Sequence, residues 1–162
     1  MGQETEKGFT AVEMLVAAGL VCLIALLALR PMKNYLRRLE FKNSSQNIKR
    51  LIQTAQSKAM ADPNVHVGIY FDRSVSPNRA FLFQDKSSPA NYNYDGSADP
   101  MYLKPEPLKK GTSFQLLTGY PDEIVFRGDG SAWKSMKIVM TNGTLYDTLD
   151  VLASTGRVRV GR

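Results

Sequence analysis

One apolar run near the start of the chain limits what this sequence can fold into. Residues 9–29 form a run of 21 residues in which eleven are Leu, Ile, Phe or Val and only Glu13 is charged. As an α-helix the run is about 31 Å long, enough to cross the hydrocarbon core of a bilayer. Its apolar side chains favour insertion by about 3–7 kcal/mol, whereas Glu13 costs at most about 3 kcal/mol and less near a helix end. We therefore expect a membrane-spanning helix.

A secretory signal peptide is the competing interpretation of this run. No small-residue cleavage motif follows it, because Arg30 and Pro31 come next. Orientation is a separate question. The residues before the run carry a net charge of −1, and Lys33, Arg37 and Arg38 follow it. Taken alone, the positive-inside rule places the C-terminal part in the cytoplasm.

The positive charge of the chain is concentrated in one segment. The 162 residues carry a formal net charge of +6. Residues 1–29 carry a net charge of −2, residues 30–61 carry +7, and residues 62–162 carry only +1. The basic run at residues 30–50 therefore predicts contact with anionic lipid headgroups or with acidic partners, or else a solvated helix face. A single cysteine, Cys22, excludes a disulfide framework within one copy.

The segment after the apolar run predicts more helix and then strands. Pro31 is expected to end or kink the first helix, and the polar residues 42–47 to loosen or re-cap the next one. From residue 48 one helix face is apolar up to the stop signal at residues 62–64, through Ile48, Leu51, Ile52, Ala55 and Ala59. Strands are expected at residues 65–71, 79–84, 112–116, 123–127, 136–141, 144–152 and 157–160.

This order of elements predicts an α+β fold in which a long N-terminal helix, first transmembrane and then amphipathic, packs on an antiparallel β-sheet. The dipeptide Asn142-Gly143 is a strong hairpin signal between two of the strands. Residues 86–111 have no periodicity, and their length marks a functional, variable or mobile loop.

A short motif opens the apolar run. Residues 7–13 read KGFTAVE, with Gly8 before Phe9 and an acidic residue, Glu13, fifth from that aromatic. This pattern resembles the processing site of type IV prepilins and of type II secretion pseudopilins. The resemblance implies cleavage by a prepilin peptidase after Gly8, N-methylation of Phe9, and a cytoplasmic leader, which overrides the charge rule above. A lone carboxylate in an apolar helix is costly without a partner. In a filament, we expect the freed, positive amine of a neighbour's Phe9 to be this partner; the alternative is a glutamate whose carboxylate reaches the membrane surface.

Three further segments are similar to the GspH/FimT (FimU-like) group of minor pilins and pseudopilins: residues 51–71, 124–130 and 156–159. The resemblance implies a leader at residues 1–8, a transmembrane and filament-core helix at 9–33, an amphipathic helix at 34–61, and a β-rich globular domain at 62–162 that includes the loop 86–111. It also implies a single-pass protein of the bacterial inner membrane with a periplasmic domain. Such a subunit later joins other pilin or pseudopilin subunits in a pilus or pseudopilus, at filament initiation or at the tip.

The C-terminus suggests a second function. Arg157 and Arg159 project from one face of a predicted strand, and Arg162 follows. This pattern resembles the C-terminus of some FimT-like subunits, which bind DNA during natural transformation. Arginines on an exposed strand engage phosphates without reading sequence. The alternative is a charged edge strand that resists aggregation.

Enzymatic chemistry is not expected. The only histidine, His66, has no catalytic or metal-binding companions, and surface placement is the simpler interpretation. Asp122, Glu123 and Asp129 lack the spacing of a calcium loop, and turn chemistry explains them. We expect no cofactor and no metal.

Overall fold

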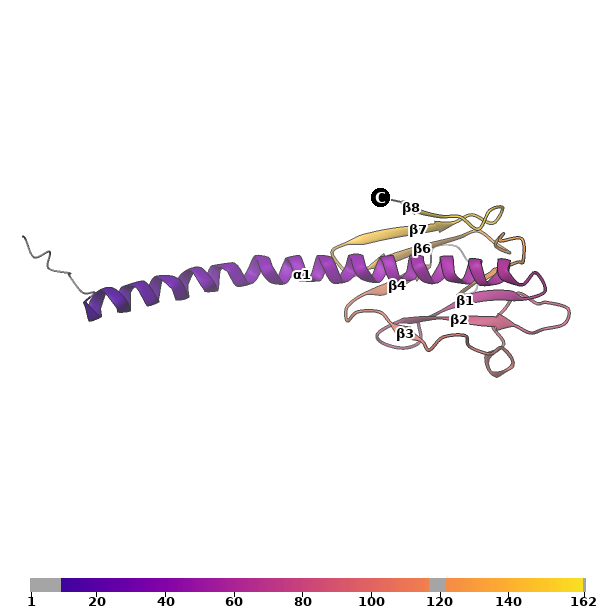
Figure 1. Cartoon of the computed structure of the whole chain (residues 1–162), viewed down its shortest axis with the longest axis horizontal. Coiled ribbons are helices and arrows are strands. Elements are labelled where there is room, and N and C mark those ends of the chain that lie inside the picture. The colour runs from indigo at the N-terminus through magenta and orange to yellow at the C-terminus, as the bar shows by residue number, and fades with distance from the viewer. Residues whose placement is uncertain (1–9, 117–121, 162) are drawn as a thin grey trace, which may run out of the picture. The chain divides into compact units, whose positions relative to one another are not determined.

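The structure is a computed structural model that describes residues 10–116 and 122–161, with all their side chains except those of residues 28–30 and 106. Its contacts divide the chain into two compact units, Met1–Arg38 and Leu39–Arg162, here named the N-terminal unit and the globular unit. One helix of 51 residues, α1 (Ala11–Ala61), contributes to both units. Figure 1 shows it as an uninterrupted ribbon.

Helix α1 continues where the sequence predicts interruptions. Pro31 lies inside the helix instead of ending it, because one proline removes one hydrogen bond and the neighbouring turns keep theirs. Residues 42–47 are helical as well. Ser44 donates a hydrogen bond to the carbonyl oxygen of Glu40 at 3.0 Å, and Ser45 donates one to the carboxylate of Asp147. Both serines are buried. Contact with the rest of the globular unit therefore offsets the poor helix propensity of this polar stretch.

The strands form two four-stranded antiparallel sheets instead of the single predicted sheet. The first sheet has the order β3-β2-β1-β5, and the second has the order β4-β6-β7-β8. The elements are β1 (His66–Asp72), β2 (Arg79–Asp85), η1 (Gly96–Ala98), β3 (Glu106–Pro107), β4 (Ser113–Leu116), β5 (Glu123–Phe126), β6 (Met136–Thr141), β7 (Tyr146–Val151) and β8 (Val158–Gly161). The chain enters the second sheet at β4, returns to the first at β5, and enters the second again at β6. Each predicted strand is present, Asn142 and Gly143 lie in the β6–β7 hairpin, and the α+β class is confirmed.

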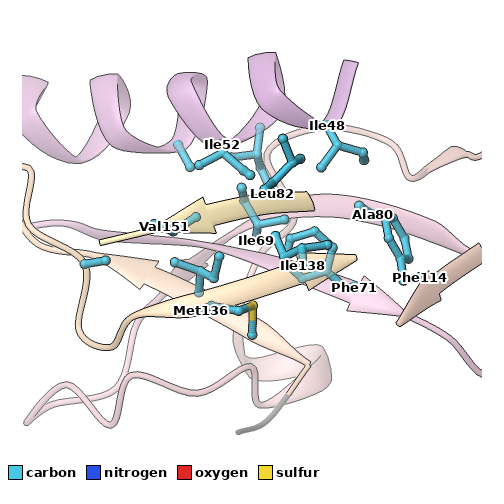
Figure 2. Close-up of a cluster of buried hydrophobic side chains, with 14 of the residues drawn as sticks. Ile48, Ile52, Ile69, Phe71, Ala80, Leu82, Phe114, Met136, Ile138 and Val151 are labelled. Carbon is cyan, nitrogen blue, oxygen red and sulfur yellow. The ribbon is translucent and has the colours of Figure 1, made fainter. Parts of the chain in front are cut away.

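The core of the globular unit lies between α1 and the inner faces of both sheets. On the helix, Ile52, Ala55 and Ala59 are fully buried. Their partners come from the first sheet, including Ile69, Phe71 and Leu82, and from the second, including Ile138, Leu149 and Val151. Figure 2 shows side chains of both sheets meeting beneath the helix. The apolar face predicted from residue 48 onward is therefore confirmed as the face that holds the two sheets together.

The long segment at residues 86–111 packs against the outer face of the first sheet. The ring of Tyr94 lies 5.0 Å from the rings of both Tyr70 and Phe83. Carboxylates bind the backbone of the segment: Asp99 is 2% exposed and accepts two backbone N–H groups, and Glu123 accepts the N–H of Tyr94 at 2.7 Å. Aromatic packing and hydrogen bonds thus tie the segment to the sheet, where the sequence predicts a functional, variable or mobile loop.

Candidate functional site

Glu13 lies in the first turn of α1 and is bound by Thr10. The backbone N–H and the hydroxyl of Thr10 donate to Oε2 of Glu13 at 2.8 and 2.9 Å, and the N–H of Glu13 donates to the Thr10 hydroxyl at 3.3 Å. This reciprocal pattern is a capping box, in which two side chains satisfy the free N–H groups of a helix start. Thr10 is not among the residues predicted from the sequence, although the signal is present there as Thr-x-x-Glu directly before an apolar run.

The apolar side chains that follow Glu13 have no partners within the described part of the chain. Leu15, Val21 and Leu27 are 75%, 66% and 70% exposed. By length and composition α1 can cross a membrane, and none of its most apolar stretch is buried. Leucine and valine exposed on every side of a helix cost free energy in water, so this surface requires lipid or neighbouring helices.

Two residues of the predicted processing site, Gly8 and Phe9, lie outside the described residues. Cleavage after Gly8 and methylation of Phe9 therefore stay predictions. The described residues begin with Thr10, which holds the carboxylate of Glu13.

Arg157 and Arg159 are both exposed near the C-terminal end of the second sheet. Arg159 lies in β8, whereas Arg157 precedes the strand by one residue, and its N–H donates to the hydroxyl of Thr155 at 3.3 Å. Between them, Val158 packs against the core. Val160, on the other side of Arg159, is 47% exposed. Arg162 lies outside the described residues.

The surroundings of Arg159 are not purely basic. In the strand register Asp150 of β7 pairs with Arg159 on one side and with Lys137 of β6 on the other. Lys137 and Asp150 form an ion pair at 4.0 Å. The carboxylate of Asp150 thus lowers the positive potential around Arg159, which weakens the attraction of a phosphate backbone.

The three segments that resemble the GspH/FimT group meet at the end of α1. The amide nitrogen of Gln56 donates to the carbonyl oxygens of Gly130 and Thr155 at 2.8 and 3.0 Å. Gly156 is buried with φ +60°, and a Cβ at this position would overlap the Gly130 oxygen. The glycine of the Gly156-Arg157 pair is therefore required by close packing, independently of any role for the arginine.

Carboxyl groups of the first sheet have shifted pKa values because of their different surroundings. Burial raises the pKa of Glu123, and the nearby charges of Asp95 and Asp122 act in the same direction. Hydrogen bonds from Ser74 lower the pKa of Asp72, and the adjacent Arg79 adds to this effect. These carboxylates hold loops and neighbouring strands, so their perturbation is structural.

The remaining candidates from the sequence have local roles. His66 packs edge to face against Tyr92, with 5.0 Å between ring centroids. Asp122 pairs with Arg73 at 2.6 Å, and Asp129 accepts hydrogen bonds from Ser131 within a turn. In the part of the chain that the structure describes, no three His, Cys, Asp or Glu residues are grouped as metal ligands would be.

The long N-terminal helix and the two antiparallel sheets match the type IV pilin-like fold, the fold of minor pilins and pseudopilins. The minor pilin FimU of Pseudomonas aeruginosa superposes with a TM-score of 0.59 at 12% identity, over 79% of this chain and 92% of that one. The minor pseudopilin EpsH of the type 2 secretion system of Vibrio cholerae superposes with a TM-score of 0.55 at 13% identity, over 75% of this chain and 96% of that one. No family model and no curated protein matches the sequence.

Proposed function

We propose that this chain is a minor pilin or pseudopilin, a structural and non-catalytic subunit of a type IV pilus or a type II secretion pseudopilus. The observation that carries the proposal is the helix α1, whose first half is apolar and exposed and begins with a capped carboxylate. The likeness to FimU and EpsH supports it, because both are minor filament subunits with this fold.

In this proposal the exposed apolar half of α1 occupies two environments in succession. Before assembly it spans the inner membrane as a single pass, with the leader in the cytoplasm and the globular unit in the periplasm. After cleavage by a prepilin peptidase it moves into the filament, at initiation or at the tip, where helices of other subunits replace lipid. The move costs little because both surroundings are apolar.

Glu13 sets the register of that packing. Thr10 satisfies Oε2 of the carboxylate, and no donor among the described residues reaches Oε1. The positively charged, methylated amine of a neighbour's Phe9 is the donor proposed for this oxygen. An ion pair within an apolar helix bundle is strong but tolerates little displacement, so it fixes the axial position of one helix against the next.

Mass spectrometry of the mature N-terminus tests the processing step. In a host with prepilin peptidase the chain should begin at N-methylated Phe9, and Gly8→Val should block cleavage because the bulkier side chain replaces the small residue at the site. An unprocessed wild-type chain in such a host would exclude this function.

The substitution Glu13→Ala tests the assembly step. The variant should remain in the membrane fraction, because it loses only a charge, yet its incorporation into filaments should fall at least about tenfold. Glu40→Ala is the matched control, since Glu40 is an exposed glutamate of the same helix. Normal incorporation of Glu13→Ala would contradict the role in register.

DNA binding during natural transformation is a second candidate, favoured by the exposure of Arg157 and Arg159. Gel shifts of the full chain in detergent at low salt, with and without Arg157→Ala, Arg159→Ala and Arg162→Ala, distinguish this candidate. Loss of a wild-type shift in the triple variant supports it. No wild-type shift excludes it, and an unchanged shift places the DNA elsewhere.

A further inference from the structure

A groove runs along the part of α1 that belongs to the globular unit. Its floor is a stripe of the helix formed by Asn47, Arg50, Leu51, Gln53, Thr54, Ser57, Lys58 and Ala61. Two shallow hollows of about 560 and 480 Å³ adjoin here and share the lining residues Arg50 and Thr54. The stripe extends over about 21 Å of helix, which suits an elongated segment better than a small molecule.

The chain segment just before β3 forms the other wall of this groove. Leu103, Lys104 and Pro105 line it opposite the helix. Leu103 is 47% exposed, and Leu51 on the floor is half-buried. The lining of this hollow thus combines incompletely covered leucines with positively charged side chains.

The charged side chains described around the groove are all positive. Arg50, Lys58 and Lys104 line it, and no acidic residue is among the described side chains that do so. None of these three cations forms an ion pair with a described side chain, although the Lys58 ammonium lies 4.7 Å from the centroid of the Tyr102 ring. The ion pairs between described side chains, Arg73–Asp122, Arg79–Asp72 and Lys137–Asp150, involve no residue that lines the groove.

We propose that this basic groove binds an acidic, amphipathic segment of a different filament subunit. Carboxylates of the segment pair with Arg50 and Lys58, and its apolar side chains cover Leu51 and Leu103. The two cations are eight residues apart, about 12 Å along the helix, so the segment carries acidic groups about two helical turns apart. The inference rests on the proposed function, because it names the surface of the globular unit that contacts a neighbouring subunit.

Charge and polarity distinguish this occupant from the alternatives. A second copy of this chain is a poorer match, because it carries the same net charge of +6. A nucleic acid would satisfy the cations but would leave Leu51 and Leu103 uncovered. An acidic protein segment with apolar residues satisfies both.

Site-specific photocross-linking in cells that assemble the filament tests the proposal on the full chain. A photoreactive residue replaces the exposed Thr54 on the groove floor, and a second variant carries it at the exposed Lys109, outside the groove. The adduct from position 54 should map to an acidic segment of another filament subunit. Arg50→Glu combined with Lys104→Glu should lower its yield at least about tenfold, and Lys109→Glu less than about twofold, because like charges then face each other only in the groove. Lys substitutions in the mapped segment should restore the yield.

Adducts with DNA, lipid or a second copy of the chain would overturn the proposal, as would equal losses in Lys109→Glu. Co-purification with filaments distinguishes a failure of the groove proposal from a failure of the proposed function. A chain that is present in filaments but gives no adduct from position 54 overturns the groove and leaves the proposed function intact. A chain absent from filaments overturns both.

Discussion

The two halves of α1 place apolar side chains in opposite surroundings. In the N-terminal unit Leu15 and Leu27 are 75% and 70% exposed, whereas in the globular unit Ile52 and Ala55 are fully buried. One continuous helix therefore contains a half that the chain itself packs and a half that it leaves uncovered. The difference is that the second half is part of a folded core, whereas the first half has no packing partner among the described residues.

The patterns of the two halves explain this difference. Apolar residues surround the first half on all sides, so no single face of a sheet could cover them. In the second half they form one stripe, and the opposite side carries polar and basic residues such as Arg50 and Lys58. A stripe fits the seam between two sheets and leaves the other side for solvent or a partner.

The largest expected effect is a difference in the free energy of unfolding between substitutions in the two halves of α1. Ile52→Ala should lower the free energy of unfolding of the globular unit by about 2–5 kcal/mol, because it leaves a cavity in the core. Leu15→Ala should leave this value unchanged, because Leu15 has no core partner. Fluorescence of Trp133 during denaturant unfolding of the full chain in detergent measures both variants. Similar losses in both would contradict the division of the helix.

A smaller effect tests what keeps the polar stretch helical. Ser45→Ala should cost about 1–3 kcal/mol, because it removes the donor to Asp147 from a buried site. Ser44→Ala is the control, since Ser44 bonds only back to its own helix, and alanine's higher helix propensity keeps the loss below about 0.5 kcal/mol. The same unfolding measurement applies. Equal losses would show that burial of the serines, and not the Asp147 bond, stabilises this stretch.

The Thr10–Glu13 capping box predicts an effect confined to the N-terminal half of α1. Thr10→Ala should destabilise the first turn of α1 by about 1 kcal/mol, because the Glu13 carboxylate and N–H lose their partner. Amide hydrogen exchange in the first turn should accelerate about fivefold by this amount, while the globular unit exchanges as before. Thr10→Ser should retain protection. Unchanged exchange in Thr10→Ala would mean that the box contributes nothing.

The smallest expected effect is on the pH dependence of the globular unit. The lowered pKa of Asp72 contributes stability that is present above about pH 4 and is lost as the pH falls through its folded pKa. The raised pKa of Glu123 acts oppositely: its contribution is present below about pH 4 and is lost as the pH rises through the folded pKa.

Melting temperatures from about pH 3 to about pH 8 measure both contributions. Asp72→Asn should reduce the loss of stability in acid and lower stability at neutral pH. Glu123→Gln should be neutral or slightly stabilising near neutral pH, because it removes the buried charge and keeps an acceptor for the N–H of Tyr94. A marked loss at neutral pH in Glu123→Gln would contradict the raised pKa.

Much of the fold follows from local patterns. The spacing of Ile48, Ile52, Ala55 and Ala59 predicts the buried helix face, and alternation of apolar residues predicts strands such as β1 and β6. Pro31 does not end the helix and residues 42–47 do not start a new one, because propensity reports only on neighbours in the chain. The kink expected at Pro31 stays a prediction. The Ser45–Asp147 hydrogen bond joins residues 102 positions apart, and no local sequence pattern predicts it.

By itself the sequence determined the apolar run with its acidic residue, the amphipathic continuation and the positions of the strands, since these depend on side chains a few residues apart. It also contained the Thr10–Glu13 capping box. Only the tertiary structure decided that the strands form two sheets, that Gln56, Gly130 and Gly156 meet, and that Lys104 lies beside Arg50 in a basic groove. Those features require distant segments to approach one another, and the burial of the core, not the local chain, determines which segments do so.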